Sequence, residues 1–521
     1  MLLPKSDVLT LVSVADGLYP PPLGGSIPPN VRCSELEGFV DALSLGISLH
    51  LNDLDQLALK FLATSLRSGA LTAVLFGKLT TRSFVDMSLP DRAELLGRIC
   101  TSRYGARRMV FNSFKRLILG TVMSYVDGQG PSSVKKDNPL WETLGYPGPP
   151  KPEAAVTGSF PFSDYTKSKE CVEGSVYDYV VIGSGSGGSA VAKTLADGIK
   201  GAKILVVEKG NWIPDNLSEI SQVESEGMST FYEKGSLLTS DDSSIMILAG
   251  CALGGGSTIN WGCCLDTPSY VRKEWREDYG VDWVDSDEFE GCLREVKEEM
   301  GVHDAIKRHS VPNQKLIYGC DKNNYKWHVA PQNIKDTGRD SAGWTCFGPK
   351  QGTYAKCVPV GERARTVLFL PPRYNLATAL PHSLYSPRWL VRSLLAGNKQ
   401  GGGITWLRDF CRSGNGTLFR GHAIKVARRK VVLAPEGGLH DKKSHFTVRV
   451  RNKVIVSCGS LHTPLVLTRS GCVNKNIGKN LHLHPVTALL ARCRDDVHGY
   501  KGKSSSSSSS SSLFVVLVAS S

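Results

Sequence analysis

Apolar residues recur at helical spacing over much of the first quarter of the chain. The stretch SELEGFVDALSLGISLHLND begins at Ser34, and LPDRAELLGRICTSRYGARRMVFNSFKRLILGTVMSYV ends at Val126. Both stretches show the period of an amphipathic helix. Ser34 with Glu37 matches a capping box, and Pro90-Asp91 is typical of a helix start. The pattern therefore predicts a helical N-terminal extension.

The segments on either side of these helices lack such periodicity. Residues 1–32 are rich in proline and glycine (YPPPLGGSIPPN) and predict an irregular lead-in. Residues 127–172 carry glycine, proline and charge throughout and predict a linker. The first predicted region, extension plus linker, thus covers residues 1–172.

The pattern changes at Tyr177, where YDYVVIGSGSGGSAVAKTLADGIKGAKILVVEKG reads as strand, glycine turn, helix and strand. Val180–Ile182 predicts a buried strand, and a helix is expected to begin near Gly187. Lys203–Val207 predicts the second strand. This order is typical of an α/β domain with a parallel sheet.

The glycine turn has the spacing G-x-G-x-x-G, with Gly183, Gly185 and Gly188 at the fixed positions. The first glycine permits a tight turn, the second lets a pyrophosphate approach the backbone, and the third lets helix and strand pack closely. The N–H groups at the start of the helix point toward phosphates. Glu208, at the end of the second strand, can accept hydrogen bonds from ribose hydroxyls, which favours FAD or NAD over NADP. The alternative is a tight turn that holds no ligand. The predicted nucleotide-binding residues are Gly183, Ser184, Gly185, Ser186, Gly187, Gly188, Glu208 and Lys209.

Two later stretches carry related signals. ILAGCALGGGSTINWGCCLDTPSYVRKEW, residues 247–275, removes three side chains in a row, which clears room for a flat ring or for cofactor backbone. A flexible loop is the alternative. In KVIVSCGSLHTPLVLTRSGC, residues 453–472, a strand runs into a helix that is expected to start at Thr463-Pro464 and to end near Ser470-Gly471. The binding residues predicted in these stretches are Gly254, Gly255, Gly256, Ser257, Asn260, Gly459 and Ser460.

Charge and cysteine content narrow the function classes. The net charge is +13, which favours acidic partners or anionic membrane surfaces. The basic residues are scattered, so nucleic acid binding is not expected. The 14 cysteines show no two-plus-two metal spacing, so no metal site is expected. Lys5, Asp7 and Asp16 interrupt the apolar start, which argues against a secretory signal and for a reduced, intracellular protein.

Two apolar stretches are too short to span a bilayer: Leu117–Val126 and Leu513–Ala519. The first, beside Lys115 and Arg116, is expected either to lie in a membrane interface or to be a helix buried in the core.

The glycine turn with Glu208, the stretch GGGSTIN, and the stretch GSLHTPLVLTRSG followed by GKNLHLHP together resemble the glucose–methanol–choline (GMC) family of FAD-dependent oxidoreductases. The resemblance implies an α/β fold. A Rossmann-like FAD-binding domain, assembled from separated chain segments, joins an α+β substrate domain built on an antiparallel sheet. It also implies these domains: 1–172, helical N-terminal extension and linker; 173–265, first part of the FAD-binding domain; 266–440, substrate domain with an irregular insertion at 354–397; 441–485, return segment of the FAD-binding domain; 486–521, irregular low-complexity tail.

The helical extension, INWGCCLDTPSYVRKEW and TWLRDF resemble the plant-type long-chain fatty alcohol oxidases of this family. The resemblance implies FAD-dependent oxidation of long-chain fatty alcohols to aldehydes, with O2 reduced to H2O2. It also implies membrane association, because the extension of that subfamily is thought to lie at a membrane.

The histidine that serves as base near the C-terminus of this family has no evident counterpart here, so the catalytic residue stays unknown. His498 lies in a polar setting, and His482 and His484 match a different family segment, so a structural or flavin-edge role is expected for them. The chain is expected to stop before the catalytic element, through truncation or mis-splicing. The alternatives are a catalytically impaired flavin-binding remnant and an NAD-dependent dehydrogenase.

Overall fold

The structure is a computed structural model that forms two compact units. It describes residues 3–18, 32–35, 38–50, 53–77, 82–124, 160–212, 227, 230–236, 238–240, 245–260, 262–305, 311–333, 357–360, 400–483, 486–493 and 512–519. The helical unit comprises Met1–Pro152, Gln222–Ala249 and Arg373–His382. The sheet unit comprises Glu153–Ser221, Gly250–Pro372 and Ser383–Ser521.

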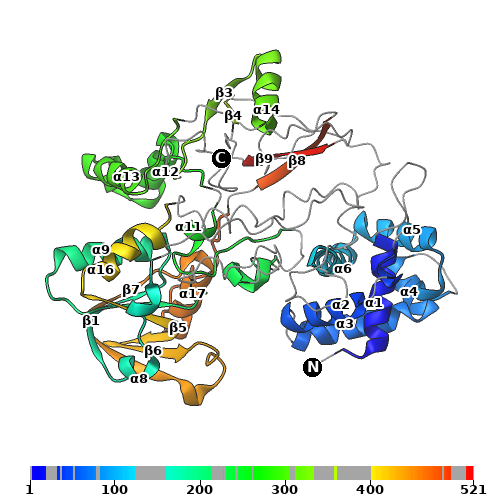
Figure 1. Cartoon of the computed structure of the whole chain (residues 1–521), viewed down its shortest axis with the longest axis horizontal. Helices are drawn as coiled ribbons and strands as arrows, with labels where there is room; N and C mark the ends of the chain where they lie inside the picture. Colours follow the sequence, from blue (N-terminus) through cyan, green and yellow to red (C-terminus); the bar gives the residue numbers. More distant parts are fainter. Residues whose placement is uncertain are drawn as a thin grey trace. The chain divides into compact units, whose positions relative to one another are not determined.

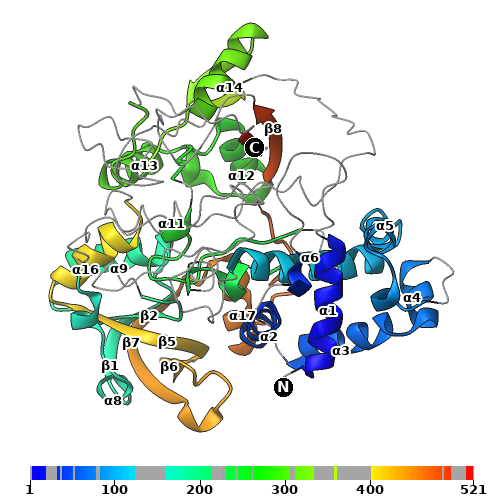
Figure 2. The same cartoon turned by 45° about the vertical axis from the view of Figure 1, so that its right-hand side comes forward.

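Helices form most of the described part of the helical unit (Figure 2). They are α1 (Lys5–Leu18), η1 (Cys33–Glu35), α2 (Phe39–His50), α3 (Asp53–Leu66), α4 (Gly69–Phe76), η2 (Phe84–Asp86), α5 (Leu89–Cys100), α6 (Gly105–Ser124) and η5 (Glu233–Ser236). α1 packs against α2, α3, α5 and α6, and Leu11, Phe39 and Phe114 are fully buried between these helices. Because this core is contributed by α1, α2 and α6, the N-terminal extension has a hydrophobic centre of its own.

The predicted irregular lead-in at 1–32 is wrong for its first half, which is the buried helix α1. The apolar positions of α1 have helical spacing, but the proline- and glycine-rich residues that follow obscured them. Its two acidic residues are buried and have partners. Asp7 pairs with Arg67 (2.7 Å), and Asp16 accepts a hydrogen bond from the backbone N–H of Ser34 (3.0 Å).

The two predicted helix starts have different outcomes. Ser34 does not cap a long helix, since it lies in the short turn η1 and α2 begins only at Phe39. The second prediction is confirmed, because α5 begins at Leu89 with Pro90 in its first turn, and Ser88 caps it by accepting from Asp91 N–H (3.4 Å).

Helix α6 contains the described part of the apolar stretch predicted at Leu117–Val126. Phe114 and Ile118 on this helix are buried in the helical core, as the alternative of a core helix predicts. No single helix among the described residues is long and apolar enough to cross a membrane. The segments Leu59–Leu66 and Gly69–Phe76 are long and apolar enough only when taken together, and a bend of 114° separates them.

A mixed five-stranded sheet organises the sheet unit (Figure 1). Its strands are β1 (Val176–Ile182), β2 (Ile204–Glu208), β5 (Gly416–Ala427), β6 (Lys430–Pro435) and β7 (Phe446–Val456), and it closes in the order β1-β2-β5-β6-β7. β1 lies between β2 and β7 and is parallel to both, β2 is parallel to β5, and β6 runs antiparallel to β5 and β7. The parallel part is the α/β sheet that the sequence predicts.

The remaining elements of the sheet unit are mostly short helices and two strand pairs. They are η3 (Phe162–Tyr165), α8 (Lys169–Val172), α9 (Ser186–Gly198), α11 (Gly256–Ile259), α12 (Ser269–Tyr279), η6 (Asp282–Asp285), α13 (Asp287–Glu299), α14 (Val311–Lys322), β3 (Lys326–Val329), β4 (Cys357–Val360), the π-helical turn η8 (Gly403–Leu407), α16 (Arg408–Arg412), η9 (Lys442–Ser444), α17 (Gly459–Arg469), β8 (Val486–Cys493) and β9 (Ser512–Ala519). β3 pairs antiparallel with β4, and β8 pairs antiparallel with β9.

Two predicted boundaries need correction. The return to the nucleotide-binding sheet was predicted at 441, but β5 already pairs with β2 from Gly416 onward. β5 and β6 therefore belong to the nucleotide-binding sheet and not to the substrate domain predicted at 266–440. The tail predicted to be irregular contains the two paired strands β8 and β9. The predicted insertion at 354–397 lies outside the described residues, except for β4.

Candidate functional site

The glycine turn lies between β1 and α9, where the sequence places it. Gly183 has φ +96°, and a Cβ there would lie 2.2 Å from the carbonyl oxygen of Ser457. A Cβ on Gly188 would lie 1.9 Å from the carbonyl oxygen of Gly183. The first and third glycines are therefore required by the close approach of α9 and the β7–α17 connection to the end of β1.

Glu208 holds the turn in place from the end of β2. It is 8% exposed, and its Oε2 accepts hydrogen bonds from the backbone N–H of Ser184 (2.8 Å) and from the Ser184 hydroxyl (2.7 Å). Its Oε1 accepts from Gly210 N–H (2.7 Å). A carboxylate has about four acceptor positions, so three are used and capacity for a ribose hydroxyl remains.

The second glycine stretch is fastened to the first through the same serine. The backbone N–H of Gly254 donates to Ser184 Oγ (3.0 Å), which in turn donates to Glu208. Gly254 and Gly255 have φ +83° and +58°, and a Cβ on Gly255 would lie 2.7 Å from Cα of Gly185. The two glycine stretches are therefore in direct backbone contact.

Three further glycines contact the second glycine stretch, and the sequence analysis did not predict them. Gly401, Gly402 and Gly403 precede TWLRDF, and the backbone N–H of Gly402 donates to Ser257 Oγ (2.8 Å). A Cβ on Gly401 would lie 2.6 Å from the carbonyl oxygen of Ser257. The run of three glycines was the available signal, and it lies just after the aperiodic stretch predicted at 354–397.

The third predicted stretch, which follows β7, also lies beside the glycine turn. Ser457 N–H donates to the carbonyl of Ile182 (2.7 Å), so the start of α17 lies beside the glycine turn. α17 begins at Gly459, not at Thr463-Pro464, and Pro464 lies inside the helix. Gly459 and Ser460 are exposed in its first turn. Nζ of Lys209 lies 2.9 Å from Nε2 of His462 on the same turn, a contact that the sequence did not indicate.

The other predicted residues take less central positions. Ser186 and Gly187 are exposed at the N-terminus of α9, where unpaired N–H groups favour an anion. Asn260 follows α11, and its Oδ1 accepts from Gly262 N–H (3.3 Å). Burial and the nearby carboxylate of Glu208 raise the pKa of Cys458 to about 11, so this thiol is neutral at pH 7 beside the site.

The glycines fall into two groups by the space around them. Gly183, Gly188, Gly254 and Gly255 are filled in by neighbouring protein atoms. In contrast, a Cβ on Gly256 or Gly459 would meet nothing within 4 Å, and one on Gly185 would meet only Cα of Gly255 at 3.9 Å. The second group therefore presents bare backbone to open space beside the N-terminus of α9. That arrangement fits a dinucleotide, with its pyrophosphate on the bare backbone and its ribose at Glu208.

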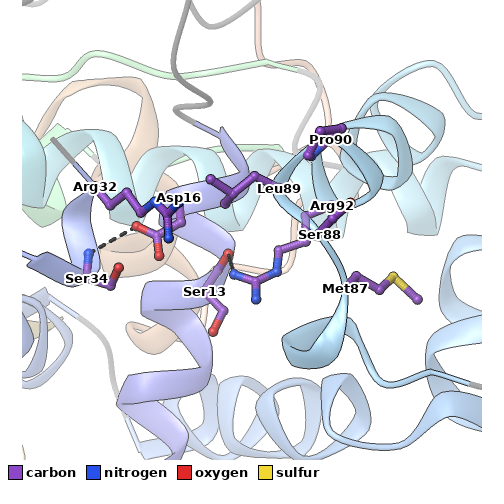
Figure 3. A pocket seen from close by; sticks show the side chains of 9 residues that line it. All are labelled: Ser13, Asp16, Arg32, Ser34, Met87, Ser88, Leu89, Pro90 and Arg92. Atoms are coloured by element: carbon purple, nitrogen blue, oxygen red, sulfur yellow. Dashed lines mark hydrogen bonds between the residues drawn. The ribbon is translucent and has the colours of Figure 1, made fainter. Parts of the chain in front are cut away.

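A hollow of about 620 Å³ lies in the helical unit (Figure 3). Its lining is mixed in charge, with Asp16, Arg32 and Arg92 as the ionisable groups. Burial lowers the pKa of Arg92, and the charge of Asp16 opposes that shift. None of the predicted cofactor-binding residues lines this hollow. Among the described residues, no group of three His, Cys, Asp or Glu side chains is placed to hold a metal ion.

Comparison with known proteins decides the family. A family model described as GMC oxidoreductase matches residues 227–360 and 391–486. A long-chain-alcohol oxidase of Arabidopsis thaliana, FAO4A, is 28% identical over 458 residues, covering 78% of this chain and 55% of that protein. The chain belongs to the GMC oxidoreductase family. The family resemblance seen in the three glycine-bearing stretches is thereby confirmed.

Two further relatives are also long-chain-alcohol oxidases. The long-chain-alcohol oxidases FAO3 and FAO4B of Arabidopsis thaliana are 30% and 33% identical, over 67% and 59% of this GMC oxidoreductase and 45% and 36% of their own lengths. The chain thus spans about half the length of the curated relatives it matches, or less. Among solved structures, a formate oxidase of Aspergillus oryzae aligns with a TM-score of 0.39 and 16% identity, over 62% of this chain and 55% of that one.

FAD is the cofactor of this GMC oxidoreductase, and the residues present fit it. Gly185, Gly256 and the N-terminus of α9 would hold the pyrophosphate, and Glu208 would hold the ribose. When bound, FAD supplies the hydride acceptor. The protein supplies the position of that cofactor, through backbone that no side chain covers.

We expect Glu208→Gln to lower the affinity for FAD by about tenfold to a hundredfold. The amide would present an NH2 group to at least one of the three donors that the carboxylate now accepts from, and hydrogen bonds to charged groups are worth about 1.5–3 kcal/mol each. Fluorescence titration of the apoprotein with FAD measures the change. Glu436→Gln, at an exposed carboxylate in the same unit, is the control and should leave the affinity unchanged. Equal affinities for wild type and Glu208→Gln would contradict the assigned role.

Proposed function

We propose that the protein oxidises long-chain fatty alcohols to aldehydes with FAD as cofactor and O2 as electron acceptor. The balance is one alcohol and one O2 to one aldehyde and one H2O2. The observation that carries the proposal is the glycine cradle around Glu208, joined by backbone contacts from residues 183–188, 254–257 and 401–403. The similarity to long-chain-alcohol oxidases supports the substrate class.

The described residues contribute cofactor binding to this reaction. The N-terminus of α9 and the open backbone at Gly185 and Gly256 bind and orient the pyrophosphate. Ser184 links Glu208 to the second glycine stretch, so hydrogen bonds connect the proposed ribose and pyrophosphate sites. We assign no residue as the base. His482 is exposed beyond α17, His484 lies outside the described residues, and the predicted structural role of both stays a prediction.

The purified full chain tests the proposal. We expect a flavin absorption band, release of FAD on heat denaturation, and peroxide production when a long-chain primary alcohol is added in air. A short-chain alcohol is the matched substrate control and should give less peroxide. If FAD is bound but no alcohol gives peroxide, the proposed substrate is wrong and the assignment of FAD stands. A protein that folds but does not take up FAD would overturn both.

We also propose that the protein acts at an intracellular membrane. A net charge of +13 favours anionic surfaces, and a long-chain alcohol partitions into a bilayer. Exposed apolar side chains on α3 and α4 support the same proposal.

A further inference from the structure

Helix α4 buries Phe76 but also presents apolar side chains to solvent. Its sequence, GALTAVLF, has Thr72 as its only polar side chain, and Thr72 is fully buried. The exposed positions are apolar instead, with Leu71 44% and Val74 71% exposed one turn apart. A helix on the surface of a globular protein normally shows its polar side to water.

The preceding helix α3, which buries Leu59, Ala63 and Leu66, also exposes apolar side chains. On α3, Gln56 and Ser65 are buried, while Leu57 and Phe61 are 54% and 69% exposed. Leu57 and Phe61 are four residues apart and so lie on one face of α3. Exposed apolar side chains that recur on consecutive helices indicate a surface that is covered in use.

Cations flank the exposed side of α4. The Arg107 guanidinium donates to the carbonyl of Val74 (3.0 Å) and lies over the ring of Tyr104, which is 51% exposed. Arg103 stacks on the same ring, 4.8 Å from its centroid. These contacts join apolar, aromatic and basic groups into one surface. Arg108 is exposed beside them and donates to the carbonyl of Ser102 (2.6 Å). We call this surface the α4 face: Leu71, Val74, Arg103, Tyr104, Arg107 and Arg108.

The sequence segment that carries Arg103, Arg107 and Arg108 has charge of one sign. Residues 95–126 contain six basic residues and no acidic one. Exposed aliphatic groups beside a tyrosine and arginines match the interface of a bilayer, where apolar groups enter between headgroups and cations meet lipid phosphates. A protein partner would need acidic groups in fixed positions, whereas a bilayer needs only charge and apolar area.

We propose that the α4 face is where the helical unit docks on a bilayer containing anionic phospholipids. This inference rests on the membrane association proposed above and specifies its surface and its lipid charge. Leu71 and Val74 enter the interface, and Arg103, Arg107 and Arg108 contact lipid phosphates.

Co-sedimentation of the full chain with vesicles tests the α4 face. We expect tighter binding to phosphatidylcholine vesicles that contain phosphatidylserine than to phosphatidylcholine alone. The double variant Leu71→Gln/Val74→Gln keeps good helix formers in α4. Its affinity for both kinds of vesicle should fall at least about tenfold. Arg103→Gln/Arg108→Gln should lower the affinity for the anionic vesicles about thirtyfold and leave the affinity for phosphatidylcholine vesicles unchanged.

Matched controls come from the sheet unit. Val473→Gln removes an apolar side chain that is 97% exposed, and Lys442→Gln/Lys443→Gln removes two exposed cations. Both should bind like wild type, and all variants should keep equal FAD content. If wild type binds no vesicle, the proposed membrane association fails. If wild type binds and the α4-face variants bind equally well, membrane association stands and this surface is wrong. A dimer that Leu71→Gln/Val74→Gln converts to a monomer would show that the face is a contact between copies, which overturns the proposal.

Discussion

Gly185→Ala is expected to lower the affinity for FAD by about tenfold to a hundredfold without destabilising the fold. Gly185 has φ −61°, which any residue adopts, and its Cβ would meet only Cα of Gly255 at 3.9 Å. The protein therefore has room for the methyl group. The cofactor does not, because the methyl would occupy the space through which the pyrophosphate approaches the backbone, and overpacking of this kind costs about 1–3 kcal/mol.

Two measurements on one variant separate binding from folding here. Titration with FAD reports the affinity, and urea denaturation of the apoprotein reports the free energy of unfolding. Gly198→Ala is the control, since Gly198 ends the same helix α9 and has nothing within 4 Å of its Cβ position. It should change neither quantity by much. Undiminished FAD affinity in Gly185→Ala would show that the pyrophosphate does not lie against this turn.

The nucleotide-binding half was predictable because its signals are local. A buried strand, three glycines at fixed spacing, a helix and a second strand ending in an acid fall within residues 177–210. Each step has a steric or hydrogen-bonding reason, and β1, α9 and β2 occur where those reasons place them. The role of Glu208 as a clamp on Ser184 and Gly210 was less accessible, since only the folded turn brings these N–H groups to the carboxylate.

The position of β5 and β6 in the sheet was not predictable in the same way. Even a clear strand pattern in residues 416–427 would not say which strand is the neighbour. The pairing of β5 with β2 joins residues more than 200 positions apart. Gly402 and the Ser257 hydroxyl that it contacts are also far apart in the sequence, by 145 positions. Local patterns predicted the elements, and long-range packing determined their partners.

Helix α1 shows a different failure. Its apolar residues have helical spacing, but composition was averaged over residues 1–32, and the prolines at 20–29 dominated that average. In the sequence, the two acids Asp7 and Asp16 interrupt the apolar start. In the structure each is buried against a specific partner, because a buried polar group without a hydrogen bond is costly.

Gly188→Ala is expected to destabilise the sheet unit by about 3 kcal/mol or more and to abolish FAD binding with it. The added Cβ would lie 1.9 Å from the carbonyl oxygen of Gly183 and 3.0 Å from its carbonyl carbon, so α9 must move away from the end of β1. The same backbone carries Gly183 at φ +96° against Ser457, so this movement also strains the start of α17.

The comparison with Gly185→Ala makes this result specific to packing. Both variants add one methyl group to the same turn, three residues apart. One methyl enters open space, and the other enters the contact between helix and strand. Urea denaturation should therefore show a large loss of stability for Gly188→Ala and none for Gly185→Ala. Saturating FAD should recover part of the difference only if the variant still folds, because a ligand stabilises the folded state that binds it. Equal stabilities for the two variants would mean that α9 does not pack against β1 as closely as the third glycine requires.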